Sequence, residues 1–412
     1  MFQFLLQSEI HTKRLYISIS KRGRSFIMRK IISVVFVFCV FICLLGLSVF
    51  SDKTSNRISV RENRSLANPP SAKFFSSDYK NQLSDWLGDS IFMRDFFIEL
   101  RTKINENIFH VKPVHPDVCY GKDGWLFFRP QNNIEIAMGT YPLTEEHIKK
   151  IAENQQKISD YYKKHGKTYI FAVNPSKVSI YPEFLMGNYT VRETPCDMVT
   201  DYLRKHTDVL VCDMKSELLK HKNEGLLYWK DDTHWTPLGD YYAYKAIIDT
   251  LNMGDKFESA ERTEKSSLES SFGDLCTTAG ITKEGYSFTD LDFNFFTTKN
   301  QSAITEKLSE MYRKDFVQSK DPTNHFFLLE NENNSNEKNL LVYADSQFCS
   351  PSKKLSTLLG ENFYRSVFVW SREEQSAKLA EALDCDYVLY SISERFLYND
   401  SAAIYPSELI EE

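Results

Sequence analysis

The chain has 412 residues, of which 42% are hydrophobic and 14% aromatic, enough for one large α/β domain or two smaller ones. The formal net charge is −6 and the pI is about 5.9, and no basic stripe is present, which excludes a nucleic-acid-binding surface as the main function. The eight cysteines show no C-x-x-C spacing, which argues against a zinc site.

The first predicted element is a transmembrane anchor at residues 31–50, a run without a charged side chain. Its length suits a helix that crosses the hydrocarbon core at about 1.5 Å per residue. Arg29, Lys30 and other basic residues precede it, so the positive-inside rule places residues 1–30 in the cytosol and the later residues outside. We therefore expect a single-pass cell-membrane protein with an extracytoplasmic C-terminal domain, a cleaved signal peptide being the alternative. The residues before Met28 fit poorly with the anchor, and a true start at Met28 would leave a short basic region ahead of it.

Residues 51–112 are predicted to form a linker followed by amphipathic helices. The start of this segment is polar and contains Pro69 and Pro70. Between residues 74 and 107, apolar side chains such as Leu83 and Trp86 recur at helical spacing.

Residues 113–412 are predicted to form an α/β domain, because short apolar runs alternate with helical patterns. Such alternation is typical of a parallel sheet flanked by helices. The predicted strands are 125–128, 168–173, 209–212, 340–344, 366–370 and 387–391. The predicted helices are 145–165, 198–205, 237–251, 352–359 and 373–383. Residues 252–337 are polar and break the alternation, so we expect an insertion there with some β-structure, including residues 293–298.

Two segments of this domain carry residues suited to acyl transfer. The pentad Asp232–Thr236 places a carboxylate two residues before His234, on the same side of an extended segment. The apolar strand 340–344 leads into Asp345 and Ser346, at the carboxyl end where open parallel sheets bind ligands. A serine there needs a base and an orienting acid from elsewhere, and His234 and Asp232 could supply them. The plainer alternatives are a helix cap at Ser346 and a core histidine at His234.

A metal site around His234 would need a third ligand. Asp231 and Asp240 are available in the sequence, but neither an H-x-H nor an H-E-x-x-H pattern occurs. We therefore predict no metal ion.

Four further residues are candidates for substrate binding. Tyr228 and Trp235 flank the pentad, and their rings either pack in the core or stack on a sugar. Asn174 and Lys177 follow the predicted strand 168–173, so they could contact the substrate or stabilise an oxyanion at the same edge of the sheet.

The segment Tyr228–Gly239 resembles the D-T-H-W motif of the AlgJ/AlgX alginate O-acetyltransferase family, which has an SGNH-hydrolase-like fold and is related to DHHW proteins. Further stretches resemble this family in the same order: Arg61–Pro69, Asp89–Asp95, Gly121–Phe127, Asn174–Lys177, Tyr181–Glu183, Asp345–Ser346 and Glu394–Arg395. The resemblance covers residues 58–397 and implies that Asp232, His234 and Ser346 form a catalytic triad. The chain departs from the family pattern in having Ala344 in place of a glycine, and Gln347 where an aromatic or apolar residue is common.

The function that this resemblance implies is transfer of an acetyl group, through an acyl-serine, onto hydroxyls of an exopolysaccharide or cell-wall glycan. It implies no cofactor, and it implies a membrane-bound O-acyltransferase as the partner that delivers acyl groups across the bilayer. Three alternatives stay open at this point: an extracytoplasmic acetylesterase with the same triad, a catalytically silent polysaccharide-assembly protein, and a glycan-binding module.

Overall fold

A computed structural model of the chain divides it into two units, Met1–Lys112 and Pro113–Glu412. The described residues are 67–90 (except 72 and 75), 115–187, 193–269, 273–299 (except 294, 296 and 297), 326–348 (except 335 and 336), 354–370 and 379–399, with isolated residues 35, 36, 38, 58, 59, 64, 65 and 100. The predicted anchor at residues 31–50 therefore lies outside the described part, apart from three positions. None of the helices within the described residues has the length and apolar character needed to cross a bilayer.

The described part of the first unit contains helix α2 (Ser77–Asp89) and the short antiparallel pair β1 (Ile58–Ser59) and β2 (Arg64–Ser65). Ser76 caps α2, because its side chain accepts a hydrogen bond from the Tyr79 amide at 3.0 Å. At the other end of the helix, the Asp89 carboxylate accepts the Ala67 N–H at 2.8 Å. The rest of the predicted amphipathic segment lies outside the described residues, apart from residue 100.

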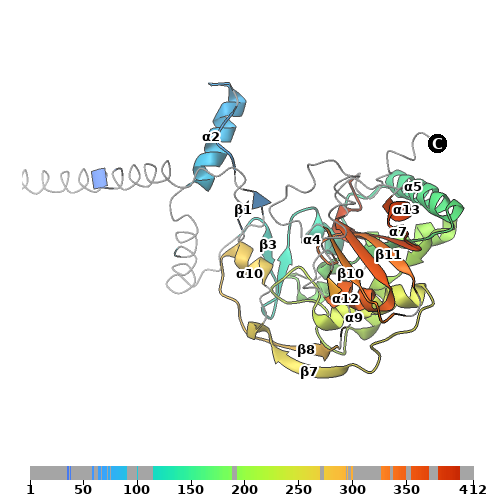
Figure 1. Cartoon of the computed structure of the whole chain (residues 1–412). Coiled ribbons are helices and arrows are strands. Elements are labelled where there is room, and N and C mark those ends of the chain that lie inside the picture. The colour runs from blue at the N-terminus through green and yellow to red at the C-terminus, as the bar shows by residue number, and fades with distance from the viewer. Residues whose placement is uncertain are drawn as a thin grey trace, which may run out of the picture. The chain divides into compact units, whose positions relative to one another are not determined.

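The second unit is built on a seven-stranded sheet in the order β6-β5-β13-β11-β12-β10-β9 (Figure 1). Its strands are β5 (Thr168–Asn174), β6 (Leu210–Cys212), β9 (Thr298–Lys299), β10 (Phe326–Glu330), β11 (Asn339–Ala344), β12 (Arg365–Trp370) and β13 (Tyr387–Ser393). The five strands from β6 to β12 in this order run parallel to one another. Strand β10 runs antiparallel to both β12 and β9, so the sheet is mixed. We had predicted a parallel sheet.

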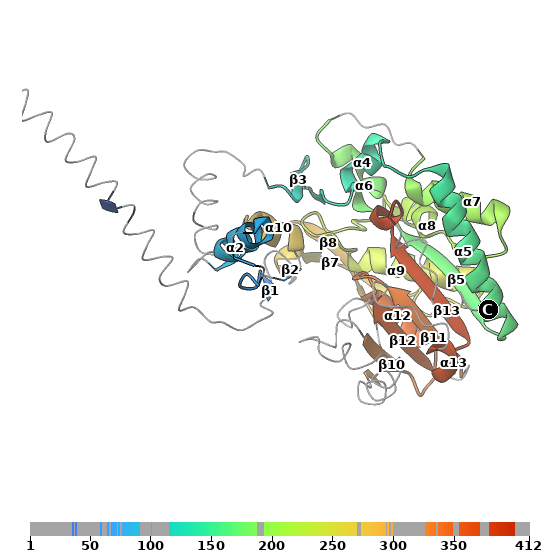
Figure 2. The ribbon, with the colours of Figure 1, turned by 90° about the horizontal axis from the view of Figure 1, so that it is seen from above.

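The alternation of side chains along each central strand divides the core into two layers. On β11, Leu340 and Val342 face one layer, while Leu341 and Tyr343 face the other. The first layer is covered by α8 (Met214–His221), α9 (Pro237–Thr250) and α12 (Lys354–Asn362), and the second by α5 (Glu145–Lys164), α7 (Pro195–His206) and α13 (Leu379–Ala382). Figure 1 shows α9 and α12 on one side of the strands and α5, α7 and α13 on the other, and Figure 2 labels the neighbouring strands β5, β13, β11, β12 and β10.

Smaller elements join the core at its edges. Strands β3 (Val118–Tyr120) and β4 (Leu126–Phe128) form an antiparallel pair that leads into α4 (Asn133–Met138). Short helices also follow the ends of β5 and β13: α6 (Lys177–Ile180) and the 3-10 helices η1 (Pro182–Phe184) and η4 (Glu394–Phe396).

Residues 252–337, which we predicted to be an insertion, supply strands to the main sheet as well as a separate antiparallel pair. They contain the antiparallel pair β7 (Glu261–Ser266) and β8 (Ser287–Asp292), with η2 (Ser267–Glu269) and α10 (Asp274–Ala279) between them. They also supply β9 and β10 to the main sheet. The strand predicted at 293–298 is not observed as such, because Phe293 lies after the end of β8 and β9 begins only at Thr298.

Candidate active site

A tight loop before α9 presents the two residues of the predicted acid–base pair. Tyr228 and Trp235 form an isolated antiparallel bridge, and the Trp229 N–H donates to the His234 carbonyl at 3.2 Å. The Thr236 N–H donates to the Leu227 carbonyl at 3.0 Å, and the Thr236 hydroxyl then caps α9 by accepting the Gly239 N–H at 3.2 Å. Asp232 and His234 therefore lie at the tip of a loop that is fixed at both ends.

Asp232, His234 and Ser346 are joined by two hydrogen bonds. The imidazole Nδ1 lies 2.6 Å from Asp232 Oδ1, and Nε2 lies 2.9 Å from Ser346 Oγ. An ionised carboxylate can only accept, so Nδ1 carries the proton and Nε2 is left to accept the serine hydroxyl. His234 is 15% exposed and the Asp232 carboxylate 2% exposed, so the base is open to a substrate while its partner is shielded from water. This is the arrangement that activates a serine for attack on an acyl group.

Three strand ends support the position of Ser346. Asp345, directly before it, accepts the Asn174 side-chain amide at 3.2 Å and the Gln347 N–H at 3.0 Å through Oδ1. Its Oδ2 accepts the Ser393 hydroxyl. Because Asn174, Asp345 and Ser393 lie at the ends of the adjacent parallel strands β5, β11 and β13, the sheet itself sets the position of the serine.

The second oxygen of Asp232 is held by residues that sequence reasoning missed. The backbone N–H groups of Gly273 and Asp274 donate to Asp232 Oδ2 at 2.8 and 3.0 Å. Gly273 has a φ of +129°, which a side chain would strain, so this turn requires glycine. The only sequence signal was the Gly-Asp pair itself, a general turn signature in a polar segment.

The Asp274 side chain adds a second carboxylate to the loop. Its Oδ1 accepts the Thr233 N–H at 2.8 Å, and its Oδ2 accepts the Thr233 hydroxyl at 2.5 Å. The same Oδ2 lies 3.8 Å from His234 Nδ1. Burial and the neighbouring Asp232 carboxylate raise the pKa of Asp274, whereas the imidazole and the Thr233 hydrogen bonds oppose the rise.

Lys177 lies beneath the loop, where its ammonium group donates to three backbone carbonyls. The acceptors are Asp232 at 2.8 Å, Trp229 at 3.0 Å and Lys230 at 3.2 Å. Burial lowers the pKa of Lys177 to about 8, and the nearby carboxylates of Asp274 and Asp232 limit the fall. In this arrangement Lys177 fixes the loop, and its predicted contact with substrate stays a prediction.

The other three predicted substrate residues are also largely buried. Tyr228 and Trp235 are 1% and 2% exposed, and their rings pack edge to face with their centroids 6.1 Å apart. The Tyr228 hydroxyl donates to the Pro175 carbonyl, and Asn174 accepts the Ser391 hydroxyl at 2.8 Å. These contacts position the loop and the strand ends. The role of the three residues in substrate binding stays a prediction.

Asp232, His234 and Asp274 also satisfy a distance criterion for a metal site, with one ligand atom of each within 4.8 Å of the others. The donor atoms, however, already have protein partners: His234 Nε2 contacts Ser346, and both oxygens of each carboxylate accept protein hydrogen bonds. Asp231, which the sequence offered as an available carboxylate, accepts the Tyr286 hydroxyl. The donor set therefore fits an acid–base pair with a serine better than a metal site.

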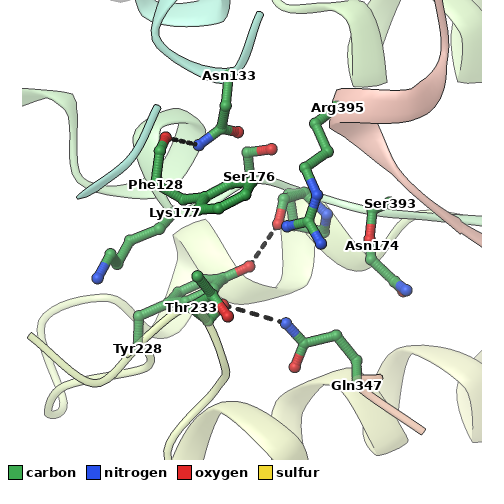
Figure 3. A pocket seen from close by; sticks show the side chains of 11 residues that line it. Phe128, Asn133, Asn174, Ser176, Lys177, Tyr228, Thr233, Gln347, Ser393 and Arg395 are labelled. Carbon is green, nitrogen blue, oxygen red and sulfur yellow. Dashed lines mark hydrogen bonds between the residues drawn. The ribbon is translucent and has the colours of Figure 1, made fainter. Parts of the chain in front are cut away.

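A pocket adjoins these residues (Figure 3). It is partly open to solvent, and its cavity volume of about 20 Å³ is room for about one water molecule. Figure 3 shows Arg395 reaching into it and Gln347 on the other side, where the Gln347 amide donates to the Thr233 carbonyl at 3.3 Å. The Arg395 guanidinium lies over the Phe128 ring, 5.3 Å from its centroid. Its lining includes Thr233 and Gln347, the chain neighbours of His234 and Ser346, but neither His234 nor Ser346 itself.

Known protein families and structures include several that this chain resembles. Residues 118–310 match the family profile of the SGNH hydrolase-like domain of acetyltransferase AlgX. The chain is 25% identical over 211 residues to "Probable alginate O-acetylase AlgJ" of Pseudomonas aeruginosa, covering 48% of this chain and 46% of that protein. It is 25% identical over 143 residues to the protein of the same name from Pseudomonas putida, covering 33% of this chain and 34% of the relative.

The chain thus matches between a third and a half of the length of these two relatives. Among solved structures, it resembles Bacillus cereus PatB1 with a sulfonyl adduct, at a TM-score of 0.48 and 18% identity over 70% of this chain and 99% of that one. It also resembles the O-acetyltransferase domain of Pseudomonas putida AlgJ, at a TM-score of 0.45 and 16% identity over 72% and 98% of the two chains.

Proposed function

We propose that this protein is an extracytoplasmic O-acetyltransferase that moves an acetyl group, through an acyl-serine at Ser346, onto hydroxyl groups of a polysaccharide. The observation that carries the proposal is the pair of hydrogen bonds that links Ser346 Oγ to His234 Nε2 and His234 Nδ1 to Asp232. The match to the AlgX domain profile and to relatives named alginate O-acetylase supports acetyl as the transferred group.

The proposed reaction has two steps that share one imidazole. In the first, Ser346 Oγ gives its proton to His234 Nε2 and attacks the carbonyl carbon of the donor ester, and the leaving group takes that proton as it departs. In the second, an acceptor hydroxyl gives its proton to Nε2 and attacks the acyl-serine. Ser346 Oγ then leaves and recovers the proton, so the enzyme is regenerated.

The surroundings of Ser346 suit a polyhydroxylated acceptor. The adjoining pocket is lined mainly by polar side chains, among them Asn133, Gln347 and Arg395. Asn133 Oδ1 is buried without a hydrogen-bond partner, so it is available to accept from a ligand hydroxyl.

The proposal also includes the source of the acyl group and the extracytoplasmic location of the domain. With residues 31–50 as an anchor, the domain would lie outside the cytosol, away from cytosolic acyl donors. A membrane-bound O-acyltransferase that passes acyl groups across the bilayer would then be the partner that loads Ser346.

The test is the intact mass of the full-length protein after brief exposure to an activated acetyl ester. We expect an acetyl-sized increase that maps to Ser346 and is absent in Ser346→Ala. Ser287→Ala removes an exposed serine of β8 and serves as the matched control, which should still be labelled. If neither the adduct nor serine-dependent ester turnover is found, the chain is an assembly or glycan-binding protein instead.

A second measurement separates the transferase from an acetylesterase. Acetylated protein is mixed with candidate oligosaccharides, and the acetyl group is followed to sugar or to water. Faster loss of the adduct with acetylated sugar as the product supports transfer. Loss at the same rate with acetate as the sole product, for every acceptor, identifies an esterase.

A further inference from the structure

Two carboxylates face the same nitrogen of His234. Asp232 Oδ1 is in hydrogen-bond contact with Nδ1 at 2.6 Å, and Asp274 Oδ2 lies 3.8 Å from the same atom. Asp274 comes from the first turn of α10, so the second carboxylate is supplied by the polar segment between β7 and β8.

Contacts with Thr233 fix the Asp274 carboxylate in this position. Both of its oxygens accept hydrogen bonds from Thr233, at 2.8 Å from the N–H and 2.5 Å from the hydroxyl. The Asp274 backbone N–H also donates to Asp232 Oδ2 at 3.0 Å. Asp274 therefore contacts the two residues that precede the imidazole in the loop, and its charge cannot turn away without breaking these bonds.

The other charged groups packed around this loop, within the described residues, have partners of their own. The Lys177 ammonium donates to three backbone carbonyls of the loop, and the carboxylates of Asp274 and Asp232 also act on its charge. Asp231 is engaged by Tyr286 and by Lys283 at 3.5 Å, and Asp345 by the strand ends. Arg395 lines the adjoining pocket above the Phe128 ring. Of the described carboxylates, those of Asp232 and Asp274 are the ones that face Nδ1 within 4 Å.

We propose that Asp274 is a positioning residue of the site, whose carboxylate holds Thr233 and stabilises the imidazolium that His234 becomes when Ser346 loses its proton. The inference deepens the proposed function and rests on it for its role in catalysis. Asp274 takes no proton in the reaction: the proton moves from Ser346 Oγ to His234 Nε2 and on to the leaving group, while Nδ1–H stays bonded to Asp232. Burial, and after it the Asp232 carboxylate, raises the pKa of Asp274, while the His234 imidazole lowers it, as expected where two carboxylates share a neighbouring cation.

The first test measures the charge of His234 without any reaction. Full-length protein carrying Ser346→Ala and labelled in its histidine rings is titrated by NMR, with and without Asp274→Asn. The amide of asparagine keeps an oxygen for Thr233 and removes the charge. We expect the pKa of His234 to fall by about one pH unit, a reduced effect for a partly solvated pair roughly 4 Å apart.

Two control variants separate charge from structure. Asp292→Asn neutralises an exposed carboxylate at the end of β8 and should leave the His234 titration unchanged. Thr233→Val removes one hydrogen bond to Asp274 and the 3.4 Å contact of the Thr233 hydroxyl with His234 Nδ1, but it keeps the carboxylate, so it should shift the titration much less than Asp274→Asn. If Asp274→Asn does not fold, Asp274→Ser provides the second charge-removing variant. An unchanged His234 pKa in a folded charge-removing variant overturns the proposal, and so does an equal shift in Asp292→Asn.

The second test follows acylation of Ser346 against pH. Asp274→Asn should lower the acylation rate about tenfold and move its acidic limb down by the same amount as the NMR titration. A lower rate with an unmoved limb would mean that Asp274 is structural only, which contradicts the proposal. If the unmutated protein forms no acyl-serine, the proposed function fails, while the NMR titration still decides whether Asp274 acts on His234.

Discussion

Lys177 is the buried cation on which the conformation of the acid–base loop depends. It is 5% exposed, and its ammonium group supplies donors to three carbonyls of the loop. We expect Lys177→Met to lower the rate of Ser346 acylation by about 10- to 100-fold, because the loss of these bonds releases the backbone around Asp232. The measurement is the acylation rate beside that of Lys163→Met, which changes an exposed lysine of α5 and should behave as the unmutated protein.

Because the pKa of Lys177 is lowered, we expect activity to fall with rising alkaline pH while the contribution of this group to the free energy of unfolding rises. Its charge is present at neutral pH and is lost as the pH rises through about 8, so activity that depends on the ammonium group should decline above that point. In the unfolded chain the same lysine keeps its proton up to about 10.4. Between these values the unfolded state binds more protons, so this group makes the folded state more stable as pH rises. Denaturant unfolding at several pH values, as the difference between unmutated protein and Lys177→Met, should show that rise, and a falling difference would contradict it.

At this scale, the sequence was informative where chemistry and local pattern coincide. Asp232 and His234 stand two residues apart in one motif, and Ser346 follows a short apolar run, so local pattern was enough to single out all three. Asp274 could not be found in this way, because it lies in a polar segment without periodicity and reaches His234 only through the tertiary fold. The direction of the Lys177 side chain was equally hidden, since a lysine after a strand end can turn either to substrate or to backbone.

Among the elements, the junction between the acid–base loop and α9 tolerates no side chain at Gly239. A Cβ at this position would lie 2.0 Å from the Leu227 carbonyl oxygen, whereas one at Gly254 would meet nothing within 4 Å. We therefore expect Gly239→Ala to lower Tm by at least about 5 °C and to slow acylation, because the loop must separate from the helix. Gly254→Ala is the matched control for thermal unfolding, and equal Tm values for the two variants would refute the steric argument.

Glu394 ties the end of β13 to two helices through one side chain. It is fully buried, and its carboxylate accepts the Ser176 N–H at 2.7 Å, the Ser179 hydroxyl at 2.5 Å and the Cys196 N–H at 3.0 Å. Glu394→Ala leaves these donors at the starts of α6 and α7 without an acceptor, so we expect a loss of about 3 kcal/mol or more in the free energy of unfolding. Urea unfolding beside Glu146→Gln, an exposed glutamate of α5, provides the comparison. A midpoint that falls no further than that of the control would show that Glu394 is dispensable.

The central strands could be predicted because they are short, apolar and buried on both faces, as β5, β11, β12 and β13 are. Strand β10 was not predicted, because Phe326–Glu330 lies in the polar segment 252–337 that we expected to be an insertion, and its antiparallel direction depends on the path of the chain before it. The pairing of β13 between β5 and β11 was also beyond local patterns, because it is decided by packing between segments far apart in the sequence.

For the molecule as a whole, the anchor at residues 31–50 remains a prediction. We expect the full-length protein to stay with membranes after an alkaline carbonate wash, and Phe41→Arg combined with Leu45→Arg to release it, because each charge costs about 3 kcal/mol at the centre of a bilayer. Leu5→Arg places a charge in the predicted cytosolic segment and should leave membrane association unchanged. Membrane retention of the double variant would rule out the anchor, and protection of the C-terminal domain from protease added outside the cell would rule out the proposed orientation.

The position of β13 affects how the protein folds during synthesis. This strand is the last one along the described chain, yet it lies between β5 and β11 and brings Ser393 to Asp345. The ribosome therefore releases the segments with His234 and Ser346 well before the strand that fills the space between them. We therefore expect a polypeptide that ends before β13 to lack the middle of its sheet and the Ser393 contact with Asp345, and to be inactive.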